Sequence, residues 1–436
     1  MFKNPFKANN SDNKKIRPQQ SLYIGVSKES NQPQYIEPSK AFGHTSISGQ
    51  LGSGAKKLMQ NMVEDQIGNG GGLVYLDIQG DIETLERLYE KAKSENRVDD
   101  LLIIDIQHPE KSNTYNPLKN GNAAELAQKI SCFLDHVEMK SPKVPCESLE
   151  INDIHTIILA LQTLEKSFGI DTIRKLVDKT GCKELISLHE ELVAKEGNVH
   201  LISALNDVIE KYKINTDQPT TEKAFVSFIN HYDSCSQDLK SLCFSADSDI
   251  DFLDVFKNKK IVYIDLNGYA NEHSAHTLTQ LILLDLRASL DAVGGDFSQK
   301  TKQPFIFFSN DCLNLLDHFW ARLYGYTNPS EFQMIQTNQT PLELILDKKH
   351  TAHEYSELIL GNTENRIYFK MEQPEHNFVV SDAFGYLVQA TINTSTKQVR
   401  EHAKTPVLPL AKLESLCVDE ALHFKEMALQ STFLLK

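Results

Sequence analysis

Long hydrophobic runs are missing from this sequence. None of the apolar stretches in its 436 residues approaches the roughly 20 residues that a membrane-spanning helix needs, so we expect no integral membrane protein. The first residues are basic and polar and lack the apolar core of a secretory signal. They also contain few large apolar side chains, which predicts a disordered tail over residues 1–20. The expected location is therefore the cytoplasm.

Clustered cysteines and excess positive charge are also missing. The seven cysteines are scattered and form no C-x-x-C pair, which excludes a zinc knuckle or a disulfide framework and indicates reduced thiols. The chain has 45 basic and 59 acidic residues, a formal net charge of −14. Binding to a phosphate backbone requires clustered Lys and Arg. This balance argues against a dedicated nucleic-acid binder but leaves a local basic channel open.

Short apolar runs that end in polar turns are what the sequence does contain. They do not alternate, which is typical of strands buried on both faces of a parallel sheet covered by helices. Three of them end in aspartate, at the sheet edge where α/β proteins bind ligands, although aspartate also favours such turns for structural reasons alone. The runs are residues 73–77, 101–105, 261–265, 305–309 and 367–371.

Helical periodicity replaces the strand signal between the second and third runs. Ile151, Ile154, Ile158 and Leu161, for example, recur on one helical face. We therefore expect an α/β fold, with a mostly parallel sheet between helices, that is interrupted by an all-α insertion. The expected division is a disordered tail (1–20), a first α/β part (21–121), the all-α insertion (122–225) and a second α/β part with a C-terminal flap (226–436).

A glycine-rich loop is the sharpest local motif. A phosphate-binding loop reads G-x-x-x-x-G-K-[S/T] between a strand and a helix. Its backbone amides surround the phosphates, its Lys reaches the terminal phosphates, and its hydroxyl binds Mg²⁺. Gly49 and Gly54 have this spacing, with Gly52 and Ser53 between them, and the flanking residues predict a strand before the loop and a helix after it.

The two residues after the loop depart from this pattern. Ala55 stands where the Lys belongs, and Lys56 stands where the Ser or Thr belongs. The backbone amides and the helix dipole can still bind an anion. Lys56 lies about 100° further around the helix, so it can replace the missing Lys only if the loop is distorted. We expect at most weak binding of ATP or ADP with Mg²⁺ at Gly49, Gly52, Ser53, Gly54, Ala55 and Lys56.

Nucleotide hydrolysis also needs an acidic pair after a buried strand, with Asp for Mg²⁺ and Glu for the attacking water. Residues 305–316 are the suitable place. In one register Asp311 is the Mg²⁺ ligand and Cys312 replaces the Glu; in the other, Asn310 and Asp311 form the pair. One carboxylate is missing in either register, and a thiol is not a matched general base. We therefore expect no enzyme or, if the site is active, an ATPase.

With these motifs in place, the sequence resembles the TraD-type conjugative coupling proteins, RecA-like ATPases related to FtsK and HerA that feed DNA or protein into type IV secretion channels. The similarity covers residues 22–436 and follows the family's motifs in order. They are the loop region His44–Lys57, Asp77-Ile-Gln-Gly-Asp81 (similar to D-P-K-G-D), Tyr115-Asn-Pro-Leu118 and Phe332–Thr340 (similar to a sensor strand ending in Q-T). The resemblance implies a RecA-like P-loop NTPase fold and makes Gln339 the γ-phosphate sensor.

The departures from the family concern its chemistry. The P-loop Lys and Thr are Ala55 and Lys56 here, the Lys of D-P-K-G-D is Gln79, and the catalytic Glu is Cys312. The family's N-terminal membrane anchor is also not found. The leading hypothesis is therefore a pseudo-ATPase that acts as a scaffold, adaptor or regulatory subunit of a conjugation or type IV secretion system. The alternative is an active ATP-driven DNA translocase that uses Lys56 in a shifted loop and Asp311 with a base from a partner.

The resemblance also implies partners and a location. The expected partners are other components of the secretion apparatus, among them a paralogous coupling ATPase, in a homo- or hetero-oligomeric ring. DNA is a further candidate ligand. The expected location is the bacterial cytoplasm, with contact to the inner membrane only through a partner.

Overall fold

The computed structural model describes residues 21–36, 43–138, 148–177, 182–196, 198–214, 223–266, 272–293, 303–311, 318–327, 331–339, 358–383, 386–393, 398–406, 408–425 and 428–435. The predicted tail over residues 1–20 and Cys312 lie outside these ranges. No helix within them is long and apolar enough to cross a membrane.

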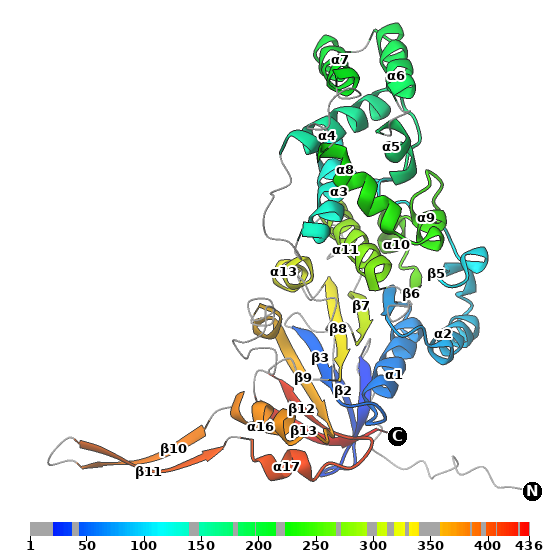
Figure 1. Cartoon of the computed structure of the whole chain (residues 1–436). Coiled ribbons are helices and arrows are strands. Elements are labelled where there is room, and N and C mark those ends of the chain that lie inside the picture. Colours follow the sequence, from blue (N-terminus) through cyan, green and yellow to red (C-terminus); the bar gives the residue numbers. More distant parts are fainter. Residues whose placement is uncertain are drawn as a thin grey trace, which may run out of the picture.

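One large sheet forms the base of the molecule (Figure 1). Its strands are β1 (Leu22–Ser27), β2 (Pro33–Ile36), β3 (His44–Ser48), β4 (Leu73–Asp77), β5 (Leu101–Asp105), β6 (Ile261–Asp265), β7 (Phe305–Asn310), β8 (Phe332–Asn338), β9 (Thr363–Phe369), β12 (Glu420–Lys425) and β13 (Ala428–Leu434). Within the described residues the order is β2-β1-β13-β12-β9-β3-β8-β7-β4-β6-β5. The strands from β9 to β5 are parallel, and the other four continue the sheet antiparallel.

The predicted strands are present. Strands β4, β5 and β6 have the expected bounds, and β7 extends one residue further. The last expected run is shifted: β9 begins earlier, at Thr363, because its first residue pairs with His44 of β3. Successive side chains of β4 enter two different apolar clusters, with Val74 on one face of the sheet and Tyr75 on the other. Burial on both faces explains why the apolar runs do not alternate.

Helices cover both faces of the parallel part. Helices α1 (Ala55–Gly68) and α2 (Ile82–Ser94) pack on one face, and α10 (Phe252–Lys257), α11 (Glu272–Val293) and α13 (His318–Tyr326) pack on the other. The prediction of a mostly parallel sheet between helices is therefore confirmed.

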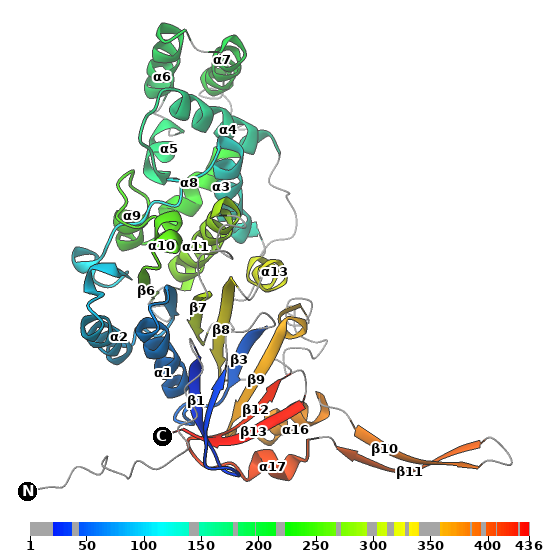
Figure 2. The same cartoon turned by 180° about the vertical axis from the view of Figure 1, so that it is seen from behind.

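The chain between β5 and β6 is mainly helical, as the periodicity predicts. Its helices before α10 are α3 (Ala123–Glu138), α4 (Ser148–Thr163), α5 (Ile170–Leu176), α6 (Cys182–Ala194), α7 (Val199–Ile214), α8 (Lys223–Ser234) and α9 (Gln237–Cys243). Figures 1 and 2 show them extending away from the sheet, with α6 and α7 at the far end. Ile154, Ile158 and Leu161 are buried on the predicted face of α4. The expected domain boundary at residue 225 falls inside α8, and the domain division stays a prediction.

A buried polar cluster joins this helical region to the sheet. The ammonium of Lys129 on α3 lies 2.9 Å from the carboxylate Oδ1 of Asp285 on α11. It also donates to the carbonyl oxygens of Pro117 and Asn120, at 2.9 and 3.1 Å. The Tyr115 hydroxyl donates to Asp285 Oδ2 at 3.1 Å. The motif Tyr115-Asn-Pro-Leu118 therefore contributes to the junction between α3 and α11.

The C-terminal part contains a separate hairpin. Strands β10 (Tyr386–Asn393) and β11 (Gln398–Pro406) pair with each other and project away from the sheet (Figure 1). The short helices α16 (Pro374–Ala383) and α17 (Leu410–Glu414) flank the hairpin in sequence and pack together. Strand β13 then lies between β1 and β12. The chain end is thus part of the main sheet.

Candidate functional site

The glycine-rich loop runs from the carboxyl end of β3 directly into α1, as its spacing predicts. The amide of Gly49 donates to the carbonyl oxygen of Asn338, the last residue of β8 (2.9 Å). Gly52 and Gly54 have φ angles of +80° and +109°, which glycine adopts without strain. A Cβ on Gly54 would lie 2.7 Å from Oδ1 of Asp419. Both conformation and space therefore require glycine at position 54.

Ala55 is the first residue of α1 and is buried. A Cβ built on Gly49 would lie 3.2 Å from the Ala55 Cβ and 2.5 Å from the Ser53 Oγ, so both side chains turn toward the loop. The Ser53 hydroxyl has no hydrogen-bond partner among the described residues. The position at which a phosphate-binding loop carries its lysine is therefore uncharged and packed against the loop.

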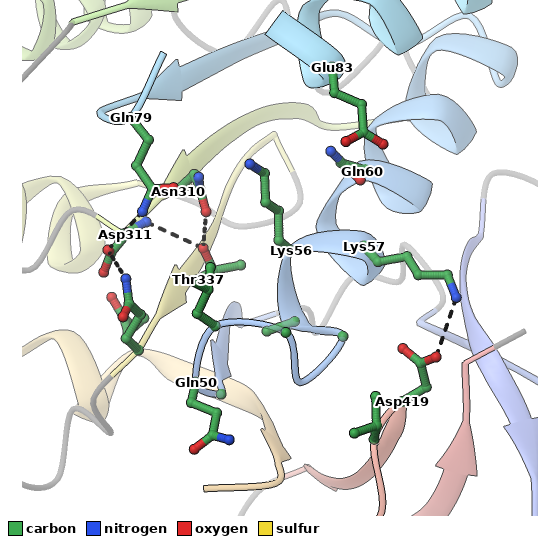
Figure 3. Close-up of a pocket in the computed structure, with 18 residues that line it drawn as sticks. Gln50, Lys56, Lys57, Gln60, Gln79, Glu83, Asn310, Asp311, Thr337 and Asp419 are labelled. Carbon is green, nitrogen blue, oxygen red and sulfur yellow. Dashed lines mark hydrogen bonds and ion pairs between the residues drawn. The ribbon is translucent and has the colours of Figure 1, made fainter. Parts of the chain in front are cut away.

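A cavity of about 370 Å³ lies between this loop and the carboxyl ends of β7 and β8 (Figure 3). The sequence-predicted residues that line it are Gly49, Gly52, Gly54, Ala55, Lys56, Asp311 and Gln339, whereas the predicted Ser53 does not line it. Side-chain amides line much of the rest, from Gln50, Gln60, Gln79, Asn310 and Asn338. The structure thus brings together residues from five separate parts of the sequence, within 49–60, 79–83, 310–311, 337–339 and 418–419.

Lys56 extends from α1 into the cavity, between Asn310 and Gln60 in the view of Figure 3. Its ammonium lies 2.6 Å from Oδ2 of Asp81, the N-cap residue of α2. The Thr84 hydroxyl donates to the same oxygen at 2.6 Å. Burial alone would raise the pKa of Asp81, but the Lys56 ammonium and the Thr84 hydroxyl hold that pKa below its usual value. Lys56 is therefore paired with a carboxylate that stays ionised.

A second ion pair lies on the other side of the loop, and sequence reasoning missed it. The ammonium of Lys57 lies 3.5 Å from Oδ2 of Asp419, just before β12. The amide of Asp419 donates to the Ser53 carbonyl oxygen at 3.0 Å. No local pattern marks Asp419, because it reaches the loop only when β12 joins the sheet. The two lysines that follow the loop each have a carboxylate partner.

Asp311, the predicted Mg²⁺ ligand, directly follows β7. One of its carboxylate oxygens, Oδ2, accepts hydrogen bonds from the amide Nε2 of Gln339 (2.6 Å) and of Gln79 (3.3 Å). Its φ of +56° is left-handed, and its amide donates to the Thr337 carbonyl oxygen at 3.0 Å. The predicted sensor Gln339 is therefore a direct neighbour of Asp311. Gln79, at the lysine position of the D-P-K-G-D motif, contacts the same carboxylate.

Asp77, at the end of β4, is fully buried, and its carboxylate accepts hydrogen bonds from neighbouring groups. The backbone amides of Gln79 and Asp81 donate to its two carboxylate oxygens, each at 3.0 Å. The Tyr263 hydroxyl also donates to Oδ2 at 3.0 Å. Burial and the negative charge of Asp77 raise the pKa of Tyr263 far above its usual value, so the hydroxyl stays a donor. Asp77 therefore holds the turn that carries Gln79 and Asp81.

Hydrogen bonds and an ion pair already occupy most of the carboxylate oxygens that a divalent metal would need here. A Mg²⁺ site needs free carboxylate oxygens and, in a phosphate-binding loop, a hydroxyl at the position of Lys56. Both oxygens of Asp77 accept backbone amides, Oδ2 of Asp311 accepts side-chain amides, and Asp81 accepts the ammonium of Lys56. Among the residues that the structure describes, no three His, Cys, Asp or Glu side chains are grouped as a metal site.

The class of protein follows from the fold. A parallel sheet carries a glycine loop between a strand and a helix, and the neighbouring strand β8 and the next strand, β7, end in polar residues at the same edge. This is the arrangement of the RecA-like P-loop NTPase fold. No family model matches the sequence.

The chain is similar to one curated protein and to several solved structures. The chain is 22% identical over 377 residues to the type 4 coupling protein DotL of Legionella pneumophila. The aligned region covers 76% of this chain and 47% of DotL. The chain thus spans about half the length of that curated relative. It also resembles the conjugative coupling protein TrwBΔN70 (TM-score 0.58, 12% identity, 95% of this chain and 88% of that chain). It resembles VirB4 of Thermoanaerobacter pseudethanolicus as well, with a TM-score of 0.55 and 11% identity. This match covers 97% of this chain and 98% of VirB4.

These similarities confirm the resemblance that the motifs indicate. The chain has a coupling-protein-type RecA-like fold and is similar in sequence to a type 4 coupling protein. TrwB has been seen in complex with ADP and Mg²⁺ and with a non-hydrolysable ATP analogue. These ligands are a property of TrwB, with which this chain shares 12% identity.

Proposed function

We propose that this protein is a catalytically degenerate coupling-protein homologue, a pseudo-ATPase that acts as a scaffold, adaptor or regulatory subunit of a conjugation or type IV secretion system. The observation that carries the proposal is the buried Ala55 at the position of the P-loop lysine, together with the ion pair between Lys56 and Asp81. Phosphoryl transfer depends on cations that neutralise the developing charge. Here the loop lysine is absent, and the ammonium of the next lysine is shared with the Asp81 carboxylate.

The proposal includes weak nucleotide binding. The loop amides and the N-terminus of α1 favour an anion. One buried donor that lines the cavity, the amide Nδ2 of Asn338, has no hydrogen-bond partner among the described residues. A buried donor without a partner is unfavourable, and a phosphate oxygen would satisfy it. The unpaired Asn338 amide therefore favours a loop that still binds phosphate over one that has lost its phosphate site.

The proposed partners are other components of the secretion apparatus, including a paralogous coupling ATPase with which the chain would form a ring. The type IV relationship of DotL and the conjugative role of TrwB support this part. DNA is a proposed ligand of the assembly rather than of the isolated chain, because the chain's net charge of −14 disfavours tight binding to DNA. The proposal includes attachment to the inner membrane through a partner.

ATP turnover tests the proposal. We expect purified wild-type protein to release no phosphate above background, with or without single-stranded DNA. The matched variant restores all three positions (Ala55→Lys, Lys56→Thr, Cys312→Glu) and should equal or exceed the wild type. Each such group contributes about 10²–10³-fold to rate in an intact site, so any gain should be readily measurable. The alternative, an active translocase, predicts DNA-stimulated wild-type turnover that the triple substitution lowers or leaves unchanged.

A further inference from the structure

The charge at position 56 suggests how the site binds phosphate. In a phosphate-binding loop the residue at this position supplies a hydroxyl to Mg²⁺, which then bridges protein and phosphates. Here the same position supplies an ammonium, which lies 2.6 Å from Asp81. The Lys56 side chain is 33% exposed and lines the cavity that also contains Asp311 (Figure 3). A cation is thus attached to the chain at the edge of the sheet where the metal would otherwise bind.

The neighbouring carboxylates are compensated without a metal. Asp77 accepts two backbone amides and a hydroxyl, and Asp311 accepts the amides of Gln79 and Gln339. The family's lysine in the D-P-K-G-D motif is Gln79 here, and its amide donates to Asp311. A divalent ion at Asp311 would have to compete with both amides for Oδ2 or bind through Oδ1 alone. The local hydrogen bonding therefore favours a bound ammonium over a bound metal.

We propose that the Lys56 ammonium takes the place of Mg²⁺, so that this site binds the phosphates of a nucleotide without a divalent cation. This inference rests on the nucleotide binding proposed above. An ammonium has three N–H donors. One of them is used on Asp81, which leaves two for phosphate oxygens, while the loop amides and Asn338 Nδ2 contact the other oxygens.

The test is nucleotide affinity with and without magnesium. Binding of ADP and of a non-hydrolysable ATP analogue is measured by titration calorimetry at constant ionic strength, once with Mg²⁺ and once with EDTA. We expect the wild-type dissociation constants in the two buffers to agree within about twofold, because no metal-mediated contact is lost. Lys56→Thr should weaken binding in EDTA about tenfold, the effect of one charge-assisted contact, and should regain affinity when Mg²⁺ is added.

Two further variants sharpen this test. Lys93→Thr is the matched control, since it removes the same charge from an exposed lysine of α2 that does not line the cavity, and its affinity should equal that of the wild type. Asp81→Asn keeps a residue that caps helices well but removes the carboxylate that competes for Lys56. It should bind nucleotide severalfold more tightly in EDTA. Circular dichroism confirms that each variant is folded.

The outcomes separate the two proposals. Wild-type binding that is lost in EDTA would overturn the metal replacement and leave the pseudo-ATPase intact. Unchanged affinity of Lys56→Thr, or weaker binding by Asp81→Asn, would overturn it as well. Absence of binding in both buffers would remove the metal replacement and the retained phosphate site together, leaving a nucleotide-free scaffold. Turnover by the wild type in Mg²⁺ would contradict the pseudo-ATPase, whatever EDTA does.

Discussion

Replacement of Lys129 by methionine is expected to lower the free energy of unfolding by about 3–5 kcal/mol. The ammonium of Lys129 and the carboxylate of Asp285 are both almost fully buried, with side-chain exposures of 4% and 5%. Methionine fills a similar volume but leaves the Asp285 carboxylate without its cation. Burial already raises the pKa of Asp285, and the loss of Lys129 would favour its neutral form further. Urea denaturation at neutral pH measures the change.

The double variant Lys129→Met, Asp285→Asn is the control for this prediction. Asparagine carries no charge and can still accept the hydrogen bond that the Tyr115 hydroxyl donates to Asp285. Since no uncompensated charge remains, we expect the double variant to recover at least half of the lost stability. A single variant as stable as the wild type would show that the pair contributes no net stability. Equal losses in the single and double variants would point to the carbonyl oxygens of Pro117 and Asn120 instead.

Acidification is expected to destabilise the protein through His44, at the start of β3. Its Nδ1 accepts the backbone amide of Met334 (3.0 Å), so the ring proton lies on Nε2 and is donated to the Tyr324 carbonyl oxygen (3.0 Å). A second proton on Nδ1 would face the Met334 amide. Burial lowers the pKa of His44 to about 4, and the hydrogen bond to Tyr324 offsets this only in part.

The sign of the pH effect follows from the unfolded chain. There the imidazole has its ordinary pKa of about 6.5, so between pH 6.5 and 4 the unfolded state binds a proton that the native state does not. The contribution of His44 is complete above pH 6.5 and is lost as the pH falls toward 4, by about 3 kcal/mol in total. Near pH 5.5 the loss is about 1.4 kcal/mol.

The matched comparison is His44→Gln. This variant should be less stable than the wild type at neutral pH, because its amide fits the two backbone groups less well. Between pH 6.5 and 4, however, its stability should fall less steeply, and the difference between the two curves isolates His44 from the titrating carboxylates. Parallel curves would contradict the assignment.

Much of the fold is readable from local patterns. Runs such as residues 73–77 predict buried parallel strands, and their expected bounds match β4, β5 and β6. The spacing of Gly49 and Gly54 predicts a strand–loop–helix turn that is present. These predictions succeed because periodicity and glycine conformation depend on neighbours in sequence. The start of β9 was missed because its first residues are not a local apolar run. They become part of the strand only by pairing with β3.

For the candidate site, the sequence predicts which residues are unusual, but the tertiary structure decides what they contact. The sequence alone predicts that Ala55, Lys56 and Cys312 replace residues of an intact nucleotide site, because position in a motif is a local property. It cannot show which carboxylate each lysine meets. Lys57 and Asp419 lie 3.5 Å apart only because β12 and β9 extend the sheet beside the loop. Gln79 and Gln339 converge on one oxygen of Asp311 for the same reason, since parallel strands align their carboxyl ends at one edge. Charge pairing acts over a few ångströms in space, so only the tertiary structure decides which residues of the chain it joins.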